Sequence, residues 1–131
     1  MDENQHVGYR VERIIAEFRQ RGVVRSIAEF ARFIDYGAEQ TIRDIIKQRV
    51  RSIPGEFAYR LYRAGVNLEY LFEGRLPILY SEFKSEEHQC VRTRGLMLLF
   101  QNYPEIKEAM QIFLHMDAQQ QKHWIEIMRK F

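Results

Sequence analysis

The chain contains a single cysteine, Cys90, among 131 residues. One cysteine excludes a disulfide bond within the chain, and such sparse use is typical of the reducing cytoplasm, where we expect this protein to be found. We expect Cys90 to be buried as a small apolar side chain rather than to act as a redox sensor. The four histidines are scattered and complete no zinc-ligand spacing, so we expect neither a metal ion nor another cofactor.

Long apolar runs and a large net charge are also missing. No run of about 18 apolar residues exists, which argues against a membrane-spanning helix and a membrane partner. The first ten residues are polar (MDENQHVGYR) and lack the apolar core of a secretory signal. The composition, 46% apolar and 29% charged, is ordinary for a globular protein, and the length fits one domain with at most a small appendage.

The net charge of +2 is too small to indicate a nucleic-acid partner, but its distribution is uneven. Residues 76–131 are neutral, whereas residues 43–63 carry six basic and two acidic side chains. Five of these six basic residues are arginine, which suits bidentate hydrogen bonding to phosphate or guanine. The alternative interpretation is an ordinary solvated helical face.

Apolar residues recur with helical spacing along most of the chain, and no segment has the alternation typical of a strand. We therefore expect an all-α fold. Start and stop signals place amino-terminal helices at about 7–21, 26–34, 38–48 and 54–64, followed by a short helix at 67–73. Ser26 and Glu29 have the spacing of a capping box at the start of the second helix.

The short helix lies between two glycines, in the sequence GVNLEYLFEG of residues 65–74. Asn67 is a favoured amino-terminal cap, and Val66 and Leu71 occupy the positions of a hydrophobic staple. Gly74 can take the left-handed conformation that closes a helix. We expect the apolar side chains of this turn to plug one end of the core formed by the four preceding helices.

Residues 76–85 are expected to form a linker, because Pro77 prevents helix continuity there. Three helical patterns follow in residues 86–131: at about 86–101, from Pro104, and after a cap formed by Asp117 with Gln120. A module this small buries little apolar surface alone, so its apolar stripes must pack on something. We expect a homodimer, the alternative being packing onto the amino-terminal helices. The expected dimerisation residues are Leu98, Leu99, Phe113, Trp124, Ile127 and Phe131.

Several motifs follow one another in residues 26–75: SIAEFA at 26–31, Thr41-Ile42, a basic loop with a proline, and VNLEYLFEG at 66–74. This succession resembles the phage-repressor (Cro/repressor-type, XRE-like) helix-turn-helix family. The resemblance implies a five-helix DNA-binding domain over residues 7–75, with a small carboxy-terminal helical module after it. The sequence departs from the family at Asp35, where glycine is usual, and at Thr41, where an apolar residue is usual. We expect a turn that is one residue longer, with Gly37 supplying the glycine.

The resemblance also implies a function, namely a sequence-specific double-stranded DNA-binding transcriptional regulator. It would be a repressor that binds an inverted-repeat operator as a homodimer. The helix at 38–48 would enter the major groove, and the amino end of the preceding helix would contact the DNA backbone. The expected base-reading residues are Glu39, Gln40, Arg43, Asp44 and Lys47, and the expected backbone contacts are Arg25, Ser26, Thr41, Arg49 and Arg51.

Two carboxylates on the expected reading face, Glu39 and Asp44, leave a different function open, because carboxylates repel phosphate unless they meet the amino group of cytosine. This alternative is a protein–protein adaptor or anti-repressor that retains the fold without binding DNA and acts on a regulatory protein partner. We expect no enzymatic activity. Self-cleaving repressors hold a serine–lysine pair on a β-scaffold, whereas Ser81 and Lys84 lie in a short segment with no strand pattern around it.

Overall fold

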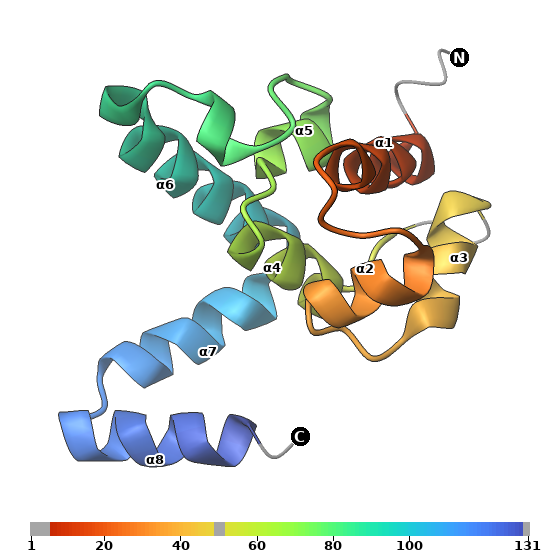
Figure 1. The fold of residues 1–131 in the computed structure, drawn as a ribbon. Coiled ribbons are helices and arrows are strands. Elements are labelled where there is room, and N and C mark those ends of the chain that lie inside the picture. Colours follow the sequence, from red (N-terminus) through yellow and green to blue (C-terminus); the bar gives the residue numbers. More distant parts are fainter. Residues whose placement is uncertain (1–5, 49–51, 130–131) are drawn as a thin grey trace. The chain divides into compact units, whose positions relative to one another are not determined.

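The computed structural model describes residues 6–48 and 52–129. Helices make up the regular structure of these residues, together with one isolated bridge between Val66 and Leu79, so the expected all-α class is confirmed. Figure 1 shows the helices in chain order. They are α1 (Val7–Gln20), α2 (Ile27–Phe33), α3 (Glu39–Ile46), α4 (Gly55–Arg63), α5 (Leu68–Glu73), the 3-10 helix η2 (Tyr80–Glu82), α6 (Ser85–Asn102), α7 (Pro104–Leu114) and α8 (Ala118–Met128).

The chain divides into two compact units, residues 1–99 and residues 100–131. In the first unit, α1 packs against α3 and α5, α2 packs against α3, and α4 packs against α5. The apolar stripes predicted from the sequence face one another there, which removes them from water and supplies the main favourable free energy of folding. The fully buried side chains of α1 to α5 include Val11, Ile14, Phe30, Ile42, Ile45, Phe57, Leu61, Leu68 and Leu71.

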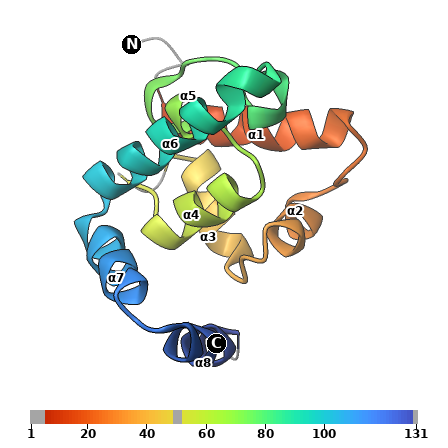
Figure 2. The same cartoon turned by 90° about the vertical axis from the view of Figure 1, so that its left-hand side faces the viewer.

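The short helix α5 plugs the core as expected. The Asn67 side chain accepts a hydrogen bond from the Glu69 amide at 3.1 Å, and Gly74 closes the helix with a φ of 76°. Figures 1 and 2 show α5 between α1 and α6. A buried arginine in α1, Arg10, adds a contact that the sequence did not predict, because its Nε donates to the Leu71 carbonyl at 2.7 Å. That bond satisfies a carbonyl at the end of α5 that has no partner within the helix.

Residues 76–85 do not form the expected linker. Ile78, Leu79 and Tyr80 are buried, and the backbone pairs with the turn before α5: the Asn67 amide donates to the Ile78 carbonyl, and the Tyr80 amide donates to the Gly65 carbonyl, both at 2.8 Å. Pro77 does end helical structure, but the apolar residues after it cover α5 instead of spanning solvent. This segment therefore belongs to the core of the first unit.

Helix α6 also belongs mostly to the first unit, so the expected module of residues 86–131 begins too early. Val91, Gly95 and Leu99 are buried along one side of α6. On α6, Arg94 donates to the Glu69 carboxylate of α5 at 2.7 Å. Cys90, expected to be buried, is exposed on this helix, because the buried side of α6 is the one that carries Val91.

The second unit contains α7 and α8, joined at a tight turn. The expected cap at the turn is confirmed: the Gln120 amide donates to Asp117 Oδ1 at 2.8 Å, and the Asp117 amide donates to Gln120 Oε1 at 3.1 Å. The Gln121 side chain donates to the Phe113 carbonyl at 3.0 Å, which fixes the end of α7 against the start of α8. No described residue of α7 is fully buried within the chain. The helix pair thus leaves much of its apolar surface in solvent.

Candidate nucleic-acid interface

The loop before α2 and the first turn of that helix are held by two sets of hydrogen bonds. Ser26 caps α2, with its Oγ accepting from the Glu29 amide at 3.1 Å. Upstream, the Arg19 guanidinium donates to the Arg25 carbonyl at 3.1 and 3.3 Å. The Arg25 side chain itself is exposed. A cation therefore lies immediately before the amino end of α2, where the helix dipole also favours a negatively charged partner.

The turn between α2 and α3 uses Asp35 where the sequence led us to expect Gly37. Asp35 has a φ of 59°, whereas Gly37 is not among the described residues with positive φ, so the expected role of Gly37 is wrong. Aspartate is one of the few residues that tolerate the left-handed region, and its carboxylate accepts from Arg60 Nη1 at 3.4 Å. Ile42 is fully buried and Thr41 only half-buried, as expected for a turn one residue longer than usual.

Helix α3 is seated on α1 by a close backbone approach. Ile42 and Ile45 are fully buried beneath it. Gly8 of α1 faces its last turn: a Cβ at that position would collide with the Ile45 carbonyl oxygen and lie 3.2 Å from that of Ile46. Only glycine permits this approach without moving α3. Gly8 was missed in the sequence, although a glycine inside a helical pattern is itself a signal of close packing.

The exposed face of α3 carries the expected base-reading residues as two bonded pairs. Arg43 donates from Nε to Glu39 Oε2 at 3.2 Å, and its Nη2 lies 3.1 Å from the same oxygen in a salt bridge. Gln40 donates from Nε2 to Asp44 Oδ1 at 3.0 Å. Lys47, just after the helix, is exposed. The structure therefore places Glu39, Gln40, Arg43 and Asp44 on α3 and Lys47 directly after it, and each carboxylate lies against a potential hydrogen-bond donor to DNA.

The expected backbone contacts are distributed less favourably. Thr41 is half-buried and lies beside the Tyr36 hydroxyl, which makes it a weaker candidate for a phosphate contact than the exposed Arg25. Burial raises the pKa of that tyrosine, so the phenol stays neutral at ordinary pH. Arg49 and Arg51 lie outside the described residues.

The expected dimerisation residues have mixed surroundings. Leu99 is fully buried within the first unit, so its expected role at an interface is wrong: α6 uses it to pack on its own chain. Leu98 and Phe113 are half-buried, and Trp124 is exposed. The side chains of Ile127 and Phe131 lie outside the described set.

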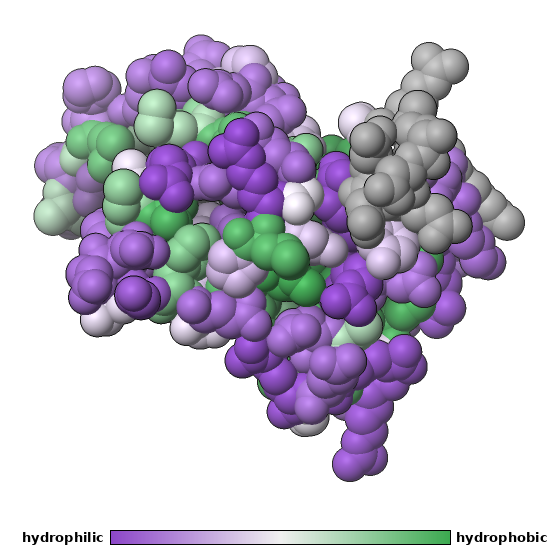
Figure 3. Space-filling view, turned by 90° about the horizontal axis from the view of Figure 1, so that it is seen from above, coloured by the Kyte–Doolittle hydropathy of each residue, from purple (hydrophilic) through white to green (hydrophobic). Residues whose placement is uncertain are grey.

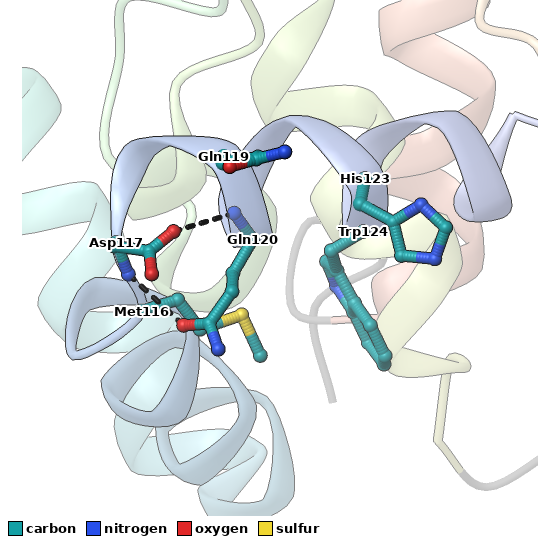
Figure 4. A pocket seen from close by; sticks show the side chains of 6 residues that line it. All are labelled: Met116, Asp117, Gln119, Gln120, His123 and Trp124. Atoms are coloured by element: carbon teal, nitrogen blue, oxygen red, sulfur yellow. Dashed lines mark hydrogen bonds between the residues drawn. The ribbon is translucent and has the colours of Figure 1, made fainter.

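A surface depression of about 500 Å³ lies at the turn between α7 and α8 (Figure 4), lined by Met116, Asp117, Gln119, Gln120, His123 and Trp124. The Asp117 carboxylate and the Gln120 side-chain oxygen each already accept a hydrogen bond from the backbone amide of the other residue, as the helix cap. No group of three metal-ligating side chains converges within residues 6–48 and 52–129. The arrangement is accounted for by helix capping, and we assign it no cofactor.

The polarity of the surface and the lengths of the helices can be compared with those of a membrane-spanning protein. Figure 3 shows a face on which hydrophilic residues predominate and hydrophobic residues form separate patches. Among the helices of the described residues, none is both long enough and apolar enough to cross a membrane.

Comparisons of the chain with known protein families, curated proteins and solved structures found no match. The family resemblance therefore rests on the motifs of residues 26–75.

Proposed function

We propose that this protein is a sequence-specific double-stranded DNA-binding transcriptional regulator, a repressor, in which α2 and α3 act as a helix-turn-helix unit. The observation that carries this proposal is the two-sided character of α3. One side is buried through Ile42 and Ile45, and the other presents polar side chains able to donate and accept hydrogen bonds.

The dimensions of α3 fit a DNA groove. A helix such as α3 is about 10–12 Å across with its side chains, which is close to the width of the major groove of about 12 Å. The seat on Gly8 and the buried isoleucines fix the helix before DNA arrives, so little ordering free energy is spent on binding. The exposed Arg25 before α2 supports a phosphate contact next to the groove.

We further propose that the protein binds an inverted-repeat operator as a homodimer through α7 and α8. Apolar side chains on these helices are exposed: Ile112 by 55%, Leu114 by 67%, Trp124 by 43% and Ile125 by 41%. A symmetric partner would cover them and would join two α3 helices in one complex, as reading of an inverted repeat requires.

A titration of DNA binding against salt tests the DNA-binding proposal. Fluorescence anisotropy with duplexes from around the protein's own coding region should give a sequence-selective complex, with a scrambled duplex of equal length as the control. A dimer that makes about six to ten phosphate contacts should lose about 10³–10⁵-fold in affinity between about 50 and about 200 mM salt. A protein–protein adaptor would bind none of the duplexes even at the lower salt concentration, and that result would refute the proposal.

Sedimentation of the full-length chain at micromolar concentration tests the dimer. We expect a dimer for the wild type and a shift to monomer for Leu114→Lys, which places a charge on the most exposed apolar side chain of α7. Gln111→Lys adds the same charge at an exposed polar position of α7 and should leave the dimer intact. A monomeric wild type would refute the dimer and leave the DNA-binding proposal to stand on its own titration.

A further inference from the structure

On α3, each of two potential base-reading side chains is bonded to a carboxylate: Arg43 to Glu39, and Gln40 to Asp44. We propose that Glu39 and Asp44 are positioning residues that orient Arg43 and Gln40 toward a guanine and an adjacent adenine. This inference rests on the proposed function and adds the identity of the bases and the role of the two acids.

The geometry of the first pair leaves one edge of the guanidinium for DNA. Arg43 donates from Nε to one oxygen of Glu39, and its Nη2 lies 3.1 Å from that oxygen, so the carboxylate meets the side edge of the guanidinium. A guanidinium has five N–H donors, so both hydrogens of Nη1 and the second hydrogen of Nη2 remain. This outer edge is the one that forms a bidentate contact with O6 and N7 of guanine. Glu39 thus holds Arg43 while leaving its reading edge uncovered.

In the second pair, the Gln40 side-chain amide is likewise bonded to a carboxylate, that of Asp44, and keeps groups for a base. The Gln40 Nε2 atom has two hydrogens, and one is given to Asp44 at 3.0 Å. The other hydrogen and the Oε1 atom together match N7 and the N6 amino group of adenine. Because the carboxylate only accepts, the bond to Asp44 fixes which end of the amide is the donor. Asp44 therefore orients Gln40 without contacting a base.

The spacing of the two readers places their bases next to each other. Gln40 and Arg43 are three residues apart on α3, hence on one face and separated by about 4.5 Å along the helix axis. Base pairs in DNA are stacked about 3.4 Å apart, so the readers reach neighbouring pairs.

The negative charge of Glu39 also affects how strongly Arg43 is attracted to the DNA backbone. A lone arginine is attracted to every phosphate, whereas Arg43 next to Glu39 forms a pair without net charge. The pair gains little from phosphate and must obtain its binding free energy from base-specific hydrogen bonds. The carboxylates on this face are therefore compatible with DNA binding, and they favour selective over non-selective binding.

The experiment begins with selection of a binding site by the full-length wild-type protein from random double-stranded DNA. We expect each half-site to contain a guanine next to an adenine. The affinity of Glu39→Gln for the selected site and for a random duplex is then measured at one salt concentration. The ratio of these affinities should fall by about fivefold or more, with relaxed preference at the guanine. Asp44→Asn should relax preference at the adenine instead.

The controls separate positioning from a simple loss of charge. Glu17→Gln breaks a similar contact on α1, where Glu17 pairs with Arg21 at 3.1 Å, and should leave the ratio unchanged. In an Arg43→Ala background, Glu39→Gln should have no further effect on the ratio. Equal gains in affinity for both duplexes from Glu39→Gln, with base preferences intact, would overturn the inference while DNA binding stands. Binding to no duplex by the wild type would overturn the proposed function itself.

Discussion

Replacement of Gly95 by alanine tests whether α6 packs against the rest of the first unit. Gly95 lies against Tyr80, and a Cβ at that position would collide with the Tyr80 hydroxyl oxygen and lie 3.2 Å from Cζ and 3.5 Å from the Leu68 Cβ. The tyrosine cannot move aside easily. Its hydroxyl accepts from the Leu68 amide at 3.2 Å, and its ring lies among those of Tyr62, Phe83 and His88.

Two effects of the added methyl group oppose each other. Crowding in a packed core costs about 1–3 kcal/mol, whereas alanine in place of glycine inside a helix gains about 0.5–1 kcal/mol. Crowding is the larger effect because the site is buried and its neighbours are fixed. We therefore expect Gly95→Ala to lower the free energy of unfolding by about 0.5–2 kcal/mol.

Chemical denaturation monitored by circular dichroism measures this change, and a double-mutant cycle identifies its cause. Tyr80→Phe removes the oxygen that the new methyl group would meet, so Gly95→Ala should cost much less in that background. Thr93→Ala, at an exposed position of α6, is the control and should be close to neutral. Stabilisation by Gly95→Ala in the wild-type background, as at an ordinary exposed helical position, would refute the docking of α6.

Three other predictions follow from the core, the alkaline titration and the reading face. Leu71 is fully buried, so Leu71→Ala should lower the free energy of unfolding by about 2–5 kcal/mol. The control is Leu76→Ala, at a residue 72% exposed, which should change the free energy of unfolding by less than about 0.5 kcal/mol. Near-wild-type unfolding of Leu71→Ala would mean that α5 is not part of the core. Burial raises the pKa of Tyr80 to about 12, above its unfolded value of about 10, so its contribution to stability is complete below about pH 10 and is lost as pH rises toward 12. Thermal melts over this range should show a smaller fall for Tyr80→Phe than for the wild type, and equal falls would contradict the titration of Tyr80. Arg43→Ala should weaken binding to the operator by about 1–3 kcal/mol and relax the preference at one base pair. Arg49→Ala should weaken binding to all duplexes alike and reduce the slope of the salt dependence by about one. An equal loss of affinity for all duplexes in both variants would refute base reading by Arg43.

Features set by neighbouring residues were predictable from the sequence. The α5 cap at Asn67, the left-handed Gly74 and the capping box of Asp117 with Gln120 all depend on side chains within a few positions of one another. The pairing of Glu39 with Arg43 also follows from i,i+4 spacing on a helix.

Features that depend on distant partners were not predictable in the same way. Pro77 indicated an interruption, but nothing local says that Ile78 and Tyr80 pair with the backbone around residues 65–67. The buried side of α6 contains a glycine, Gly95, that a hydrophobic pattern does not count as apolar, so its docking and the exposure of Cys90 were both missed. The left-handed turn was assigned to Gly37 because glycine is the default residue there, whereas Asp35 takes it with support from Arg60.

The close approach of Gly8 to the end of α3 has a consequence for protein engineering. The position of α3 is set by residues that point away from solvent, namely Gly8, Ile42 and Ile45, whereas its chemistry is set by residues that point toward solvent. The two sets share no side chain. The outward residues can therefore be randomised in a library without disturbing the orientation of the helix, and variants with new DNA preferences should keep the melting temperature of the parent. Under the proposed function, a substitution at Gly8 should have the opposite outcome and impair recognition of every sequence, although Gly8 is not one of the proposed base-reading residues.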